Sequence, residues 1–357
     1  MINVTEPFLP PKEEFDELIA GIWERKWLTN NGPLVNALEA KLSDHLGIKN
    51  IVFVGNGTVA LQIAIRALGL SKEIITTPFS YVATTTSILW ERCQPVYVDI
   101  EPLTLNIDPN KIEAAITSKT EAILATHCFG NPCDIDAIET IARKYNLKVI
   151  YDAAHCFGTT YKGRSLFDYG DISTASFHAT KIYHSIEGGA VFSHDNSLNR
   201  RISHMRNFGH AGPEKFDGIG INGKNSEFHA AMGIVNLRYI DSILARRKEQ
   251  SKNYDMLLEG MQIEHQQIAS NSEYNYSYYP IILESEEVTL EIKEALEAKA
   301  IYSRRYFYPS LNKLEYSHGD APISVDISSR ILCLPLYYDL TIKDQELVAN
   351  ILKERQR

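Results

Sequence analysis

The sequence predicts an α/β protein with a mostly parallel sheet flanked by helices, joined to a smaller α+β region at the C-terminal end. Between residues 35 and 235, short apolar runs rich in β-branched residues alternate with amphipathic helical patterns. This order is typical of parallel strands connected by crossover helices. Past residue 225 the alternation stops. The 357 residues also exceed the usual size of one hydrophobic core, so we expect two domains.

The first domain begins with two helical patterns, at residues 15–27 and 33–47, and Gly47 is the predicted C-cap of the second. Strands are predicted in the apolar runs 50–55, 73–78, 95–100, 122–128 and 148–154. Helical patterns at 58–69, 85–93 and 134–146 lie among them, and a further strand ends near Ser176. We assign residues 1–235 to an N-terminal arm and a large α/β domain.

The second domain begins with a helical pattern that runs from 226 to 261, with Gly233 tolerated inside it. Strand-like runs at 274–283 and 330–337 then alternate with helical patterns at 290–300 and 343–356. We assign residues 236–357 to a long connecting helix and a small α+β domain.

Composition excludes several classes of function. A net charge of −9 argues against a general nucleic-acid binder, because phosphate backbones select basic surfaces. The cysteines are scattered without a CxxC pair, which argues against a disulfide framework and against a metal site. The N-terminus has no secretory signal pattern, and no apolar stretch is long enough to span a membrane. We therefore expect a cytoplasmic protein.

Ligands of open parallel sheets bind outside the carboxyl ends of the strands, so polar residues at those ends are candidates for a site. Gly57 and Thr58 follow one strand and open a helix, where free backbone N–H groups and the helix dipole attract a phosphate. Alternatively, Thr58 is only the cap of that helix.

Asp152 ends a strand with a buried pattern, and His155 follows it closely. A buried carboxylate is costly unless it has a partner. The partner could be a structural arginine, or the protonated ring nitrogen of a cofactor.

Lys181 follows a strand that ends at Ser176, and two glycines come shortly after it. Most lysines are solvated surface charges, but lysine also forms Schiff bases where its pKa is lowered. A phosphate cradle, a strand-end aspartate and a strand-end lysine together match a cofactor with a phosphate, a basic ring nitrogen and an aldehyde. That cofactor is pyridoxal 5′-phosphate.

Five segments resemble, in order and spacing, the motifs of the DegT/DnrJ/StrS sugar aminotransferases: NGTVALQIAIRALG, TTPFSYVATTTSIL, YDAAHCFGTTYKGR, SFHATKIYHSIEGGAV and GINGKNSEFHAAMG. The resemblance extends from WLTNNGP to ILCLPLYYDL, nearly the whole chain. It implies the fold type I architecture of aspartate aminotransferase and a homodimer.

The resemblance also implies roles for single residues. Lys181 matches the Schiff-base lysine, and Asp152 matches the carboxylate that keeps the pyridine nitrogen protonated. His155 matches a position beside the cofactor ring, near its phenolic oxygen. Tyr81 matches the aromatic residue that stacks on the other face of the ring. Lys181, Asp152 and His155 are thus the catalytic candidates.

The phosphate ligands implied by the resemblance are Gly57, Thr58 and Ser176, with Asn222 reaching the phosphate from the partner subunit. Such a shared site would make the homodimer obligatory for activity. Many relatives read TKNL…GEGG where this chain has TKIYHSIEGG, so the roles of His184 and Glu187 stay open. A dehydratase branch of the family replaces the lysine with histidine, and the presence of Lys181 therefore favours transamination.

The family's acceptors are nucleotide-linked keto-sugars, and L-glutamate is the usual amino donor. Within the family, the segments PFLPP and WERKWLTNNGP look most like those of enzymes that make dTDP-4-amino-4,6-dideoxy-D-glucose from dTDP-4-keto-6-deoxy-D-glucose. That product is a precursor of O-antigen and other surface-polysaccharide sugars. A C3 aminotransferase acting on a dTDP-3-keto-6-deoxyhexose and a UDP-linked 4-keto-sugar aminotransferase are alternatives, because they share the catalytic residues.

Substrate contacts are less well marked by the sequence. Thr29, Asn30 and Tyr308 are candidates for contacts with the sugar. Three basic residues of the helical pattern at 226–261 would either contact the diphosphate of the substrate or form a solvent-exposed face of the helix: Arg246, Arg247 and Lys248.

Two other classes of function compete with this interpretation. A cysteine desulfurase needs a nucleophilic cysteine on a mobile loop, whereas Cys333 lies in the apolar run ILCLPL and is predicted to be buried. A non-enzymatic sensor of the same fold has no need to keep Lys181, Asp152 and Ser176 together.

Overall fold

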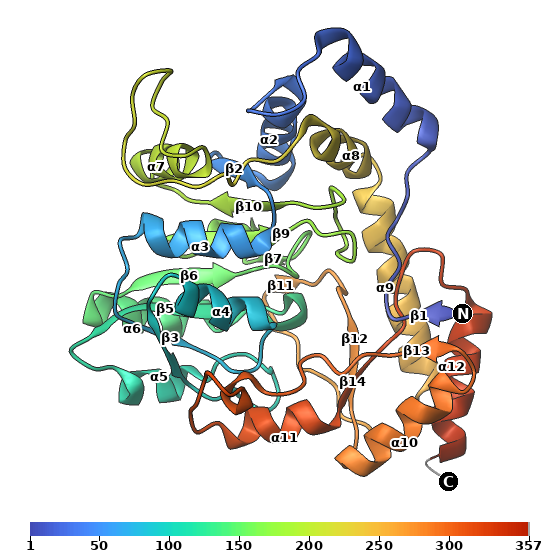
Figure 1. Cartoon of the computed structure of the whole chain (residues 1–357). Coiled ribbons are helices and arrows are strands. Elements are labelled where there is room, and N and C mark those ends of the chain that lie inside the picture. The colour runs from blue at the N-terminus through green and yellow to red at the C-terminus, as the bar shows by residue number, and fades with distance from the viewer. Residues whose placement is uncertain (356–357) are drawn as a thin grey trace.

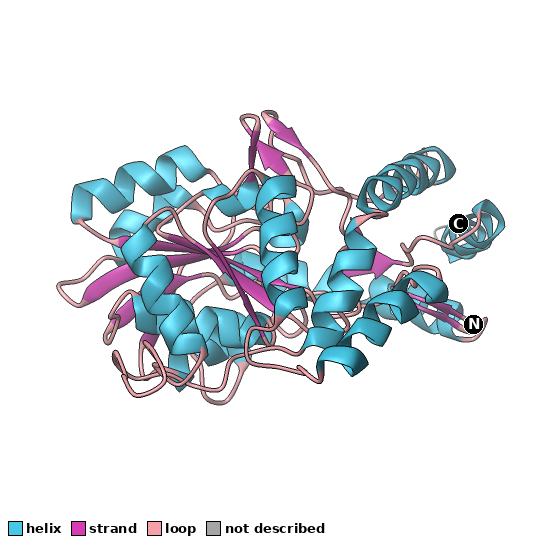
Figure 2. Cartoon of the chain, turned by 90° about the horizontal axis from the view of Figure 1, so that it is seen from above, coloured by secondary structure: helices cyan, strands magenta, loops and turns pink. Residues whose placement is uncertain are grey.

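A computed structural model of the chain describes residues 1–355. Its larger part is a seven-stranded sheet with helices on both faces (Figures 1 and 2). In spatial order the strands are β2 (Ile51–Val54), β10 (Gly189–Phe192), β9 (Ile172–Ser176), β6 (Lys148–Asp152), β5 (Thr120–Thr126), β3 (Glu73–Thr76) and β4 (Gln94–Tyr97). The predicted fold class is confirmed.

Helices cover this sheet at both faces. They are α2 (Pro33–Leu46), α3 (Gly57–Ala67), α4 (Val82–Trp90), α5 (Pro109–Ala115), α6 (Ile135–Tyr145), α7 (Asn196–Arg206) and α8 (Glu227–Leu237). The short turns η1 (Cys128–Gly130) and η2 (Leu166–Asp168) lie between them in sequence. As predicted, Gly47 ends α2 in the left-handed conformation, with its N–H bonded to the carbonyl of Ser43.

Alternate residues of each strand face two separate apolar clusters. Phe53, Ile123 and Tyr151 belong to a cluster that includes residues of α2, α6 and α8. Their neighbours Val52 and Ile150 belong to a cluster with α3, α4 and α7. The strands are therefore buried on both faces, which explains why they read as continuous apolar runs in the sequence.

One strand of the sheet runs against the others. β10 pairs antiparallel with both β2 and β9. At its start, a Cβ on Gly189 would lie 2.5 Å from the carbonyl carbon of Asn56 and 2.8 Å from the carbonyl oxygen of Ala175. Only glycine permits this approach between β10 and the turn that follows β2. The glycines near Lys181 thus serve the packing of the strand ends.

The C-terminal region is a second, smaller arrangement of helices and strands. Its elements are α9 (Ile240–Leu257), β12 (Tyr279–Ile282), α10 (Glu286–Glu297), β13 (Ile301–Tyr302), η3 (Leu311–Lys313), α11 (Pro322–Arg330), β14 (Ile331–Leu334) and α12 (Ile342–Arg355). β12 pairs antiparallel with β14, and a separate apolar cluster includes Tyr254, Leu296 and Leu352. A three-stranded sheet of β11 (Ser272–Glu273), β7 (Thr160–Tyr161) and β8 (Arg164–Ser165) stands apart.

The N-terminal arm joins this region. Strand β1 (Ile2–Asn3) pairs parallel with β13, and it lies at the same side of the molecule as α12 (Figure 1). Helix α1 (Lys12–Arg25) then leads back toward α8, which it contacts. The proposed division into domains 1–235 and 236–357 stays a prediction, and its last two residues lie outside the described part of the chain.

The helical pattern predicted over 226–261 is divided into α8 and α9. At the break, Arg238 forms a 2.6 Å ion pair with Glu14 of α1, and Tyr239 hydrogen-bonds the same carboxylate. These contacts with the N-terminal arm have no signature in the helical pattern itself. In the part of the chain that the structure describes, no helix is both long and apolar enough to cross a membrane.

Candidate active site

The carboxyl ends of the strands meet at a cavity of about 680 Å³. This volume falls in the range of small-molecule and cofactor sites. Seven of the residues to which the sequence analysis assigns a role line it: Gly57, Thr58, Tyr81, Asp152, His155, Ser176 and Lys181. The sheet therefore brings together side chains that are up to 124 positions apart (57 to 181).

One end of the cavity is the start of α3. Asn56 caps this helix, since its side chain accepts a hydrogen bond from the N–H of Val59 at 2.9 Å. Thr58 is therefore not the cap, and the first N–H groups of α3 are left for a ligand. A Cβ on Gly57 would lie 3.0 Å from the Cβ of Ser176, so the helix start and the Ser176 hydroxyl are close neighbours. The arrangement suits a phosphate.

Asp152 is 6% exposed and lies at the end of β6. Its carboxylate accepts hydrogen bonds from the Thr84 hydroxyl at 2.7 Å and from the Ala154 N–H at 3.2 Å. Within residues 1–355 it forms no ion pair, so the structural arginine considered above is absent. Desolvation raises the pKa of Asp152, and the hydrogen bond from Thr84 opposes the rise. A cationic ligand group would relieve this buried charge.

His155 is 8% exposed, and its Nδ1 has no hydrogen-bond partner among the described residues. Its ring is nearly parallel to those of Phe307 and Phe129, with centroids 5.9 and 6.3 Å away. Burial lowers the pKa of His155 well below its usual value. The imidazole is therefore neutral, and it retains one buried nitrogen free to bond a ligand.

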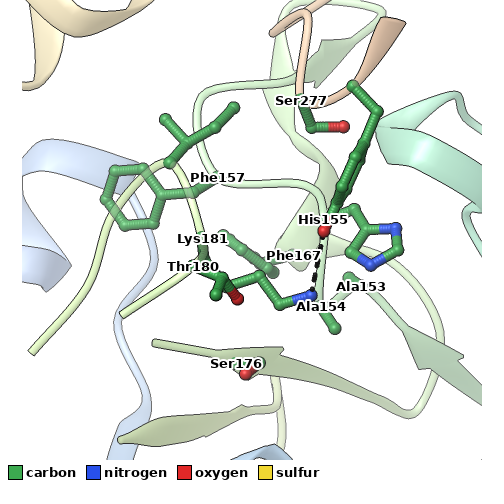
Figure 3. A pocket seen from close by; sticks show the side chains of 11 residues that line it. Ala153, Ala154, His155, Phe157, Phe167, Ser176, Thr180, Lys181 and Ser277 are labelled. Carbon is green, nitrogen blue, oxygen red and sulfur yellow. Dashed lines mark hydrogen bonds between the residues drawn. The ribbon is translucent and has the colours of Figure 1, made fainter. Parts of the chain in front are cut away.

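Lys181 is half-buried, and burial lowers the pKa of its amine to about 8. Asp152 partly offsets this shift. Its Nζ donates a hydrogen bond to the hydroxyl of Tyr278 at 3.5 Å, the dashed line in Figure 3. Figure 3 shows a small adjoining pocket that shares Lys181, Ser176 and His155 with the cavity. The lowered pKa makes the neutral, nucleophilic amine accessible near neutral pH.

The sequence predicted no role for Tyr278, because a tyrosine in a strand-like run is typical of the hydrophobic core. It is indeed 8% exposed, but it lines the cavity, and its ring lies 5.0 Å from that of His155. The segment before it is fastened to the site: Asn275 donates to the carbonyls of His155 and Phe157 at 2.7 and 2.9 Å. No local sequence signal marks this position.

Of the three helix charges considered above, Lys248 is exposed, as a solvated face requires, whereas Arg247 takes neither role. Arg247 is 3% exposed, and its guanidinium donates to the carbonyls of Tyr276 at 3.4 Å and Ser277 at 3.1 Å. Arg246 pairs with Glu249 and donates to the Leu340 carbonyl. Neither lines the cavity, and Arg247 instead supports the segment that carries Tyr278 from behind.

The remaining predicted residues lie outside the cavity of the single chain. Tyr308 is half-exposed with the Arg305 guanidinium 3.5 Å above its ring, and Asn222 is exposed and accepts from Lys224. Thr29 and Asn30 are exposed in the loop after α1. Tyr81 does line the cavity, and its ring is 58% exposed. The free ring of Tyr81 is accessible for stacking.

The structure places the two residues whose roles were open. His184 is buried, and its Nε2 lies 2.7 Å from the carbonyl of Phe8, so it ties the N-terminal arm to the segment after Lys181. Glu187 lines the cavity and lies 3.5 Å from Nε2 of His178. Cys333 is fully buried, as expected, and burial raises its pKa far above its usual value, so it is no mobile nucleophile.

These groups fit pyridoxal phosphate. A helix start and a serine hydroxyl form an anion site, and an unpaired buried carboxylate suits a protonated ring nitrogen. An exposed aromatic face and an amine of lowered pKa share the same cavity with them. The fit rests on Asp152 above all, because a buried carboxylate without a cation is otherwise costly.

A family model described as the DegT/DnrJ/EryC1/StrS aminotransferase family matches residues 11–353. The chain belongs to this family. Its members are sugar aminotransferases that depend on pyridoxal phosphate, and this chain is therefore a transaminase of that kind.

Relatives of this aminotransferase cover it almost completely. It is 42% identical over 361 residues to a dTDP-4-amino-4,6-dideoxy-D-glucose transaminase of Shigella dysenteriae, covering 99% of this chain and 98% of the relative. It is 32% identical to a GDP-perosamine synthase of Escherichia coli O157:H7, with 99% and 98% covered. Among solved structures, DesI with its TDP-sugar product superposes with a TM-score of 0.95 at 30% identity, covering 100% of this chain and 93% of that one.

Proposed function

We propose that this aminotransferase moves an amino group from L-glutamate to dTDP-4-keto-6-deoxy-D-glucose and so forms dTDP-4-amino-4,6-dideoxy-D-glucose. The observation that carries the proposal is the 42% identity, along nearly the full length, to a transaminase named for that product. The product would feed the synthesis of O-antigen or another surface polysaccharide. The GDP-perosamine synthases are less similar, at 32% identity or below, which favours dTDP over GDP as the nucleotide.

The cofactor would be held at its two ends. Gly57, Thr58 and Ser176 would bind the phosphate, and Asp152 would hold a proton on the ring nitrogen. When bound, pyridoxal phosphate supplies an aldehyde that exchanges with amines and a ring that withdraws electrons from the reacting carbon. Tyr81 would stack on one face of the ring, and the free Nδ1 of His155 would bond its phenolic oxygen.

Lys181 would move the proton of the reaction. With a pKa of about 8, its amine is partly neutral near neutral pH, so it can accept a proton from the donor carbon and return one to the sugar carbon. Tyr278 would act as a positioning residue for this amine, because its hydroxyl accepts the 3.5 Å hydrogen bond from Nζ. Arg247 and Asn275 would hold Tyr278 in place through the backbone around it.

The working unit would be a homodimer. The loop between α7 and α8, which rises above the sheet in Figure 1, exposes Phe208, Phe216, Ile219 and Ile221. Several exposed apolar side chains on one segment are typical of a protein interface. Asn222 lies on the same loop, where it could reach the phosphate of a partner's cofactor.

The test of the proposed substrate is a set of incubations of the purified enzyme with L-glutamate and separate dTDP-, UDP- and GDP-keto-sugars. NMR of the products would report the nucleotide, the ring carbon aminated and the configuration. We expect the dTDP-linked 4-keto sugar to give the highest kcat/KM. Faster amination of a 3-keto or UDP-linked sugar would replace the proposed substrate with one of the alternatives. The cytoplasmic location also stays a prediction, to be tested by cell fractionation.

A further inference from the structure

The cavity that holds Lys181 is also lined by a guanidinium, that of Arg304. Tyrosines apart, four other residues with ionisable groups line the cavity beside Lys181 and Arg304: Asp152, His155, His178 and Glu187. Asp152 and His155 are buried, whereas His178 and Glu187 lie close to each other. Within residues 1–355, no carboxylate forms an ion pair with Arg304, and no hydrogen bond satisfies its side chain. Arg304 is therefore a cation of this cavity without an anionic partner.

The backbone of Arg304 is held firmly. Its N–H donates to the carbonyl of Cys333 at 3.2 Å, and its own carbonyl accepts from the N–H of Cys333 at 2.8 Å. These two bonds fix the residue against the end of β14. Arg304 is exposed, and its fixed backbone keeps the guanidinium in the wall of the cavity, where a ligand can reach it.

The next residue has the opposite environment. Arg305 pairs with Glu286 at 2.5 Å, donates to the carbonyl of Ser329 at 2.7 Å and covers the ring of Tyr308. Arg305 does not line the cavity. Of the two consecutive arginines, Arg305 is neutralised by Glu286, whereas Arg304 lines the cavity without an ion-pair partner among the described residues.

We propose that Arg304 binds the carboxylate of the amino donor, an inference that rests on the proposed transamination from an amino acid. The α-carboxylate of such a donor is attached to the carbon that must give its proton to Lys181, so its binding cation has to share the cavity with Lys181. The diphosphate of the acceptor is attached to C1, across the sugar ring from C4, and therefore lies farther from the reacting atom. A guanidinium also matches a carboxylate in geometry, with two parallel hydrogen bonds.

Binding of glutarate, a dicarboxylate without an amino group, tests this site without turnover. We expect Arg304→Gln to weaken the affinity of the cofactor-loaded enzyme for glutarate ~10- to 100-fold in isothermal titration, as the loss of a charged hydrogen-bond pair gives. Arg304→Lys keeps the charge but not the paired donors, so it should recover part of the affinity. Unchanged glutarate affinity in Arg304→Gln, or no glutarate binding to the wild type, would overturn the proposal.

Kinetic measurements distinguish whether Arg304 binds the carboxylate of glutamate or the diphosphate of the nucleotide sugar. In the donor half-reaction without nucleotide sugar, the concentration of L-glutamate for half-maximal rate should rise by the same factor in Arg304→Gln. The KM for the nucleotide sugar should stay within about twofold. The reverse pattern, with a raised KM for the sugar and none for glutamate, would assign Arg304 to the diphosphate and overturn the proposal.

Arg305→Gln is the matched control. It removes an arginine from the adjacent position, and we expect a lower melting temperature with unchanged glutarate affinity. An equal loss of affinity in both variants would mean that Arg304 acts through the fold and not by contact. Failure of the proposed function looks different: if no dTDP-sugar is aminated, the wild type would still bind glutarate and react with glutamate, and the comparison of the variants would still hold.

Discussion

The inner end and the rim of the active-site cavity are built in different ways. At the inner end, Asp152 and His155 are 6% and 8% exposed, come from one strand end and have their partners within the same chain. At the rim, Tyr81 and Tyr308 are 58% and 51% exposed, and Asn222 lies outside the cavity. The inner end is thus held by contacts within the chain, whereas the rim is exposed, and in the proposed homodimer the substrate and a partner subunit would complete it.

The difference predicts how strongly substitutions act. Changes at the inner end remove interactions that nothing else can replace, because no water or neighbouring side chain can supply a buried charge. Changes at the rim remove one of several exposed contacts. Four predictions test this contrast, beginning with the largest effect.

Lys181→Ala should lower the rate of transamination by ~10⁴-fold or more, the scale seen when a central catalytic group is removed. The variant should still bind pyridoxal phosphate at the helix start and Ser176. In the wild type, borohydride should attach a pyridoxyl group to Lys181, as located by mass spectrometry of peptides. Lys72→Ala removes an exposed lysine that pairs with Glu121. In this control, borohydride should still label Lys181, and the rate of transamination should equal that of the wild type. A pyridoxyl group on any other lysine would contradict the assignment.

Asp152→Asn should lower kcat by ~100-fold or more while leaving the shape of the site intact, since it removes a preorganised charge that stabilises the transition state. Steady-state kinetics at saturating cofactor would measure the loss. Because burial raises the pKa of the folded carboxyl and the carboxyl forms no ion pair within residues 1–355, the variant without cofactor should be no less stable than the wild type. Near-normal turnover would show that Asp152 is structural.

Tyr278→Phe should lower kcat ~10-fold, since it removes one positioning hydrogen bond and none of the reacting groups. The hydroxyl accepts from Nζ and so favours the charged amine, and its loss should lower the pKa of Lys181 further below 8. Trace labelling of the cofactor-free enzyme with an amine reagent would follow this pKa. The labelling midpoint of Lys181, near pH 8 in the wild type, should move to lower pH.

The control for this substitution is Tyr306→Phe. Tyr306 also lines the cavity, but no hydrogen bond joins its hydroxyl to Lys181 in the described structure. We expect its labelling midpoint to stay at the wild-type value. Equal shifts in both variants would show that the tyrosines act on Lys181 only through the general polarity of the cavity.

Mixing two inactive variants tests the rim. If Asn222 serves the partner's cofactor, Lys181→Ala and a bulky Asn222→Trp variant should regenerate about a quarter of wild-type activity after subunit exchange, because half the dimers are mixed and each has one intact site. Lys181→Ala mixed with Asp152→Asn is the matched control, since both residues belong to one chain's cavity and no intact site can form. Absence of recovery with demonstrated exchange would assign Asn222 to its own subunit.

The strand ends were predictable because their chemistry is local. Each of the strands β2, β3, β5 and β6 contains a continuous apolar run. Gly57 comes shortly after β2, Asp152 ends β6, and Lys181 comes shortly after β9. β10 was not predicted, because a strand that begins with glycine reads as loop. The helical region expected over 226–261 is interrupted at Arg238 and Tyr239, the two residues that contact Glu14.

The sequence by itself determined the layered fold and the class of reaction, and it predicted the set of cofactor ligands. It did so because a strand that is buried on both faces shows as an unbroken apolar run, and the polar residues at the end of the strand follow directly in the sequence. Tertiary structure alone decided that Tyr278 bonds Lys181, that Arg247 is buried behind it and that Arg304 rather than Arg305 faces the cavity. The bond between Tyr278 and Lys181 joins residues 97 positions apart, through the packing of the C-terminal region on the sheet. No local pattern records such contacts, because whether a side chain meets a ligand or the core depends on what the rest of the chain places opposite it.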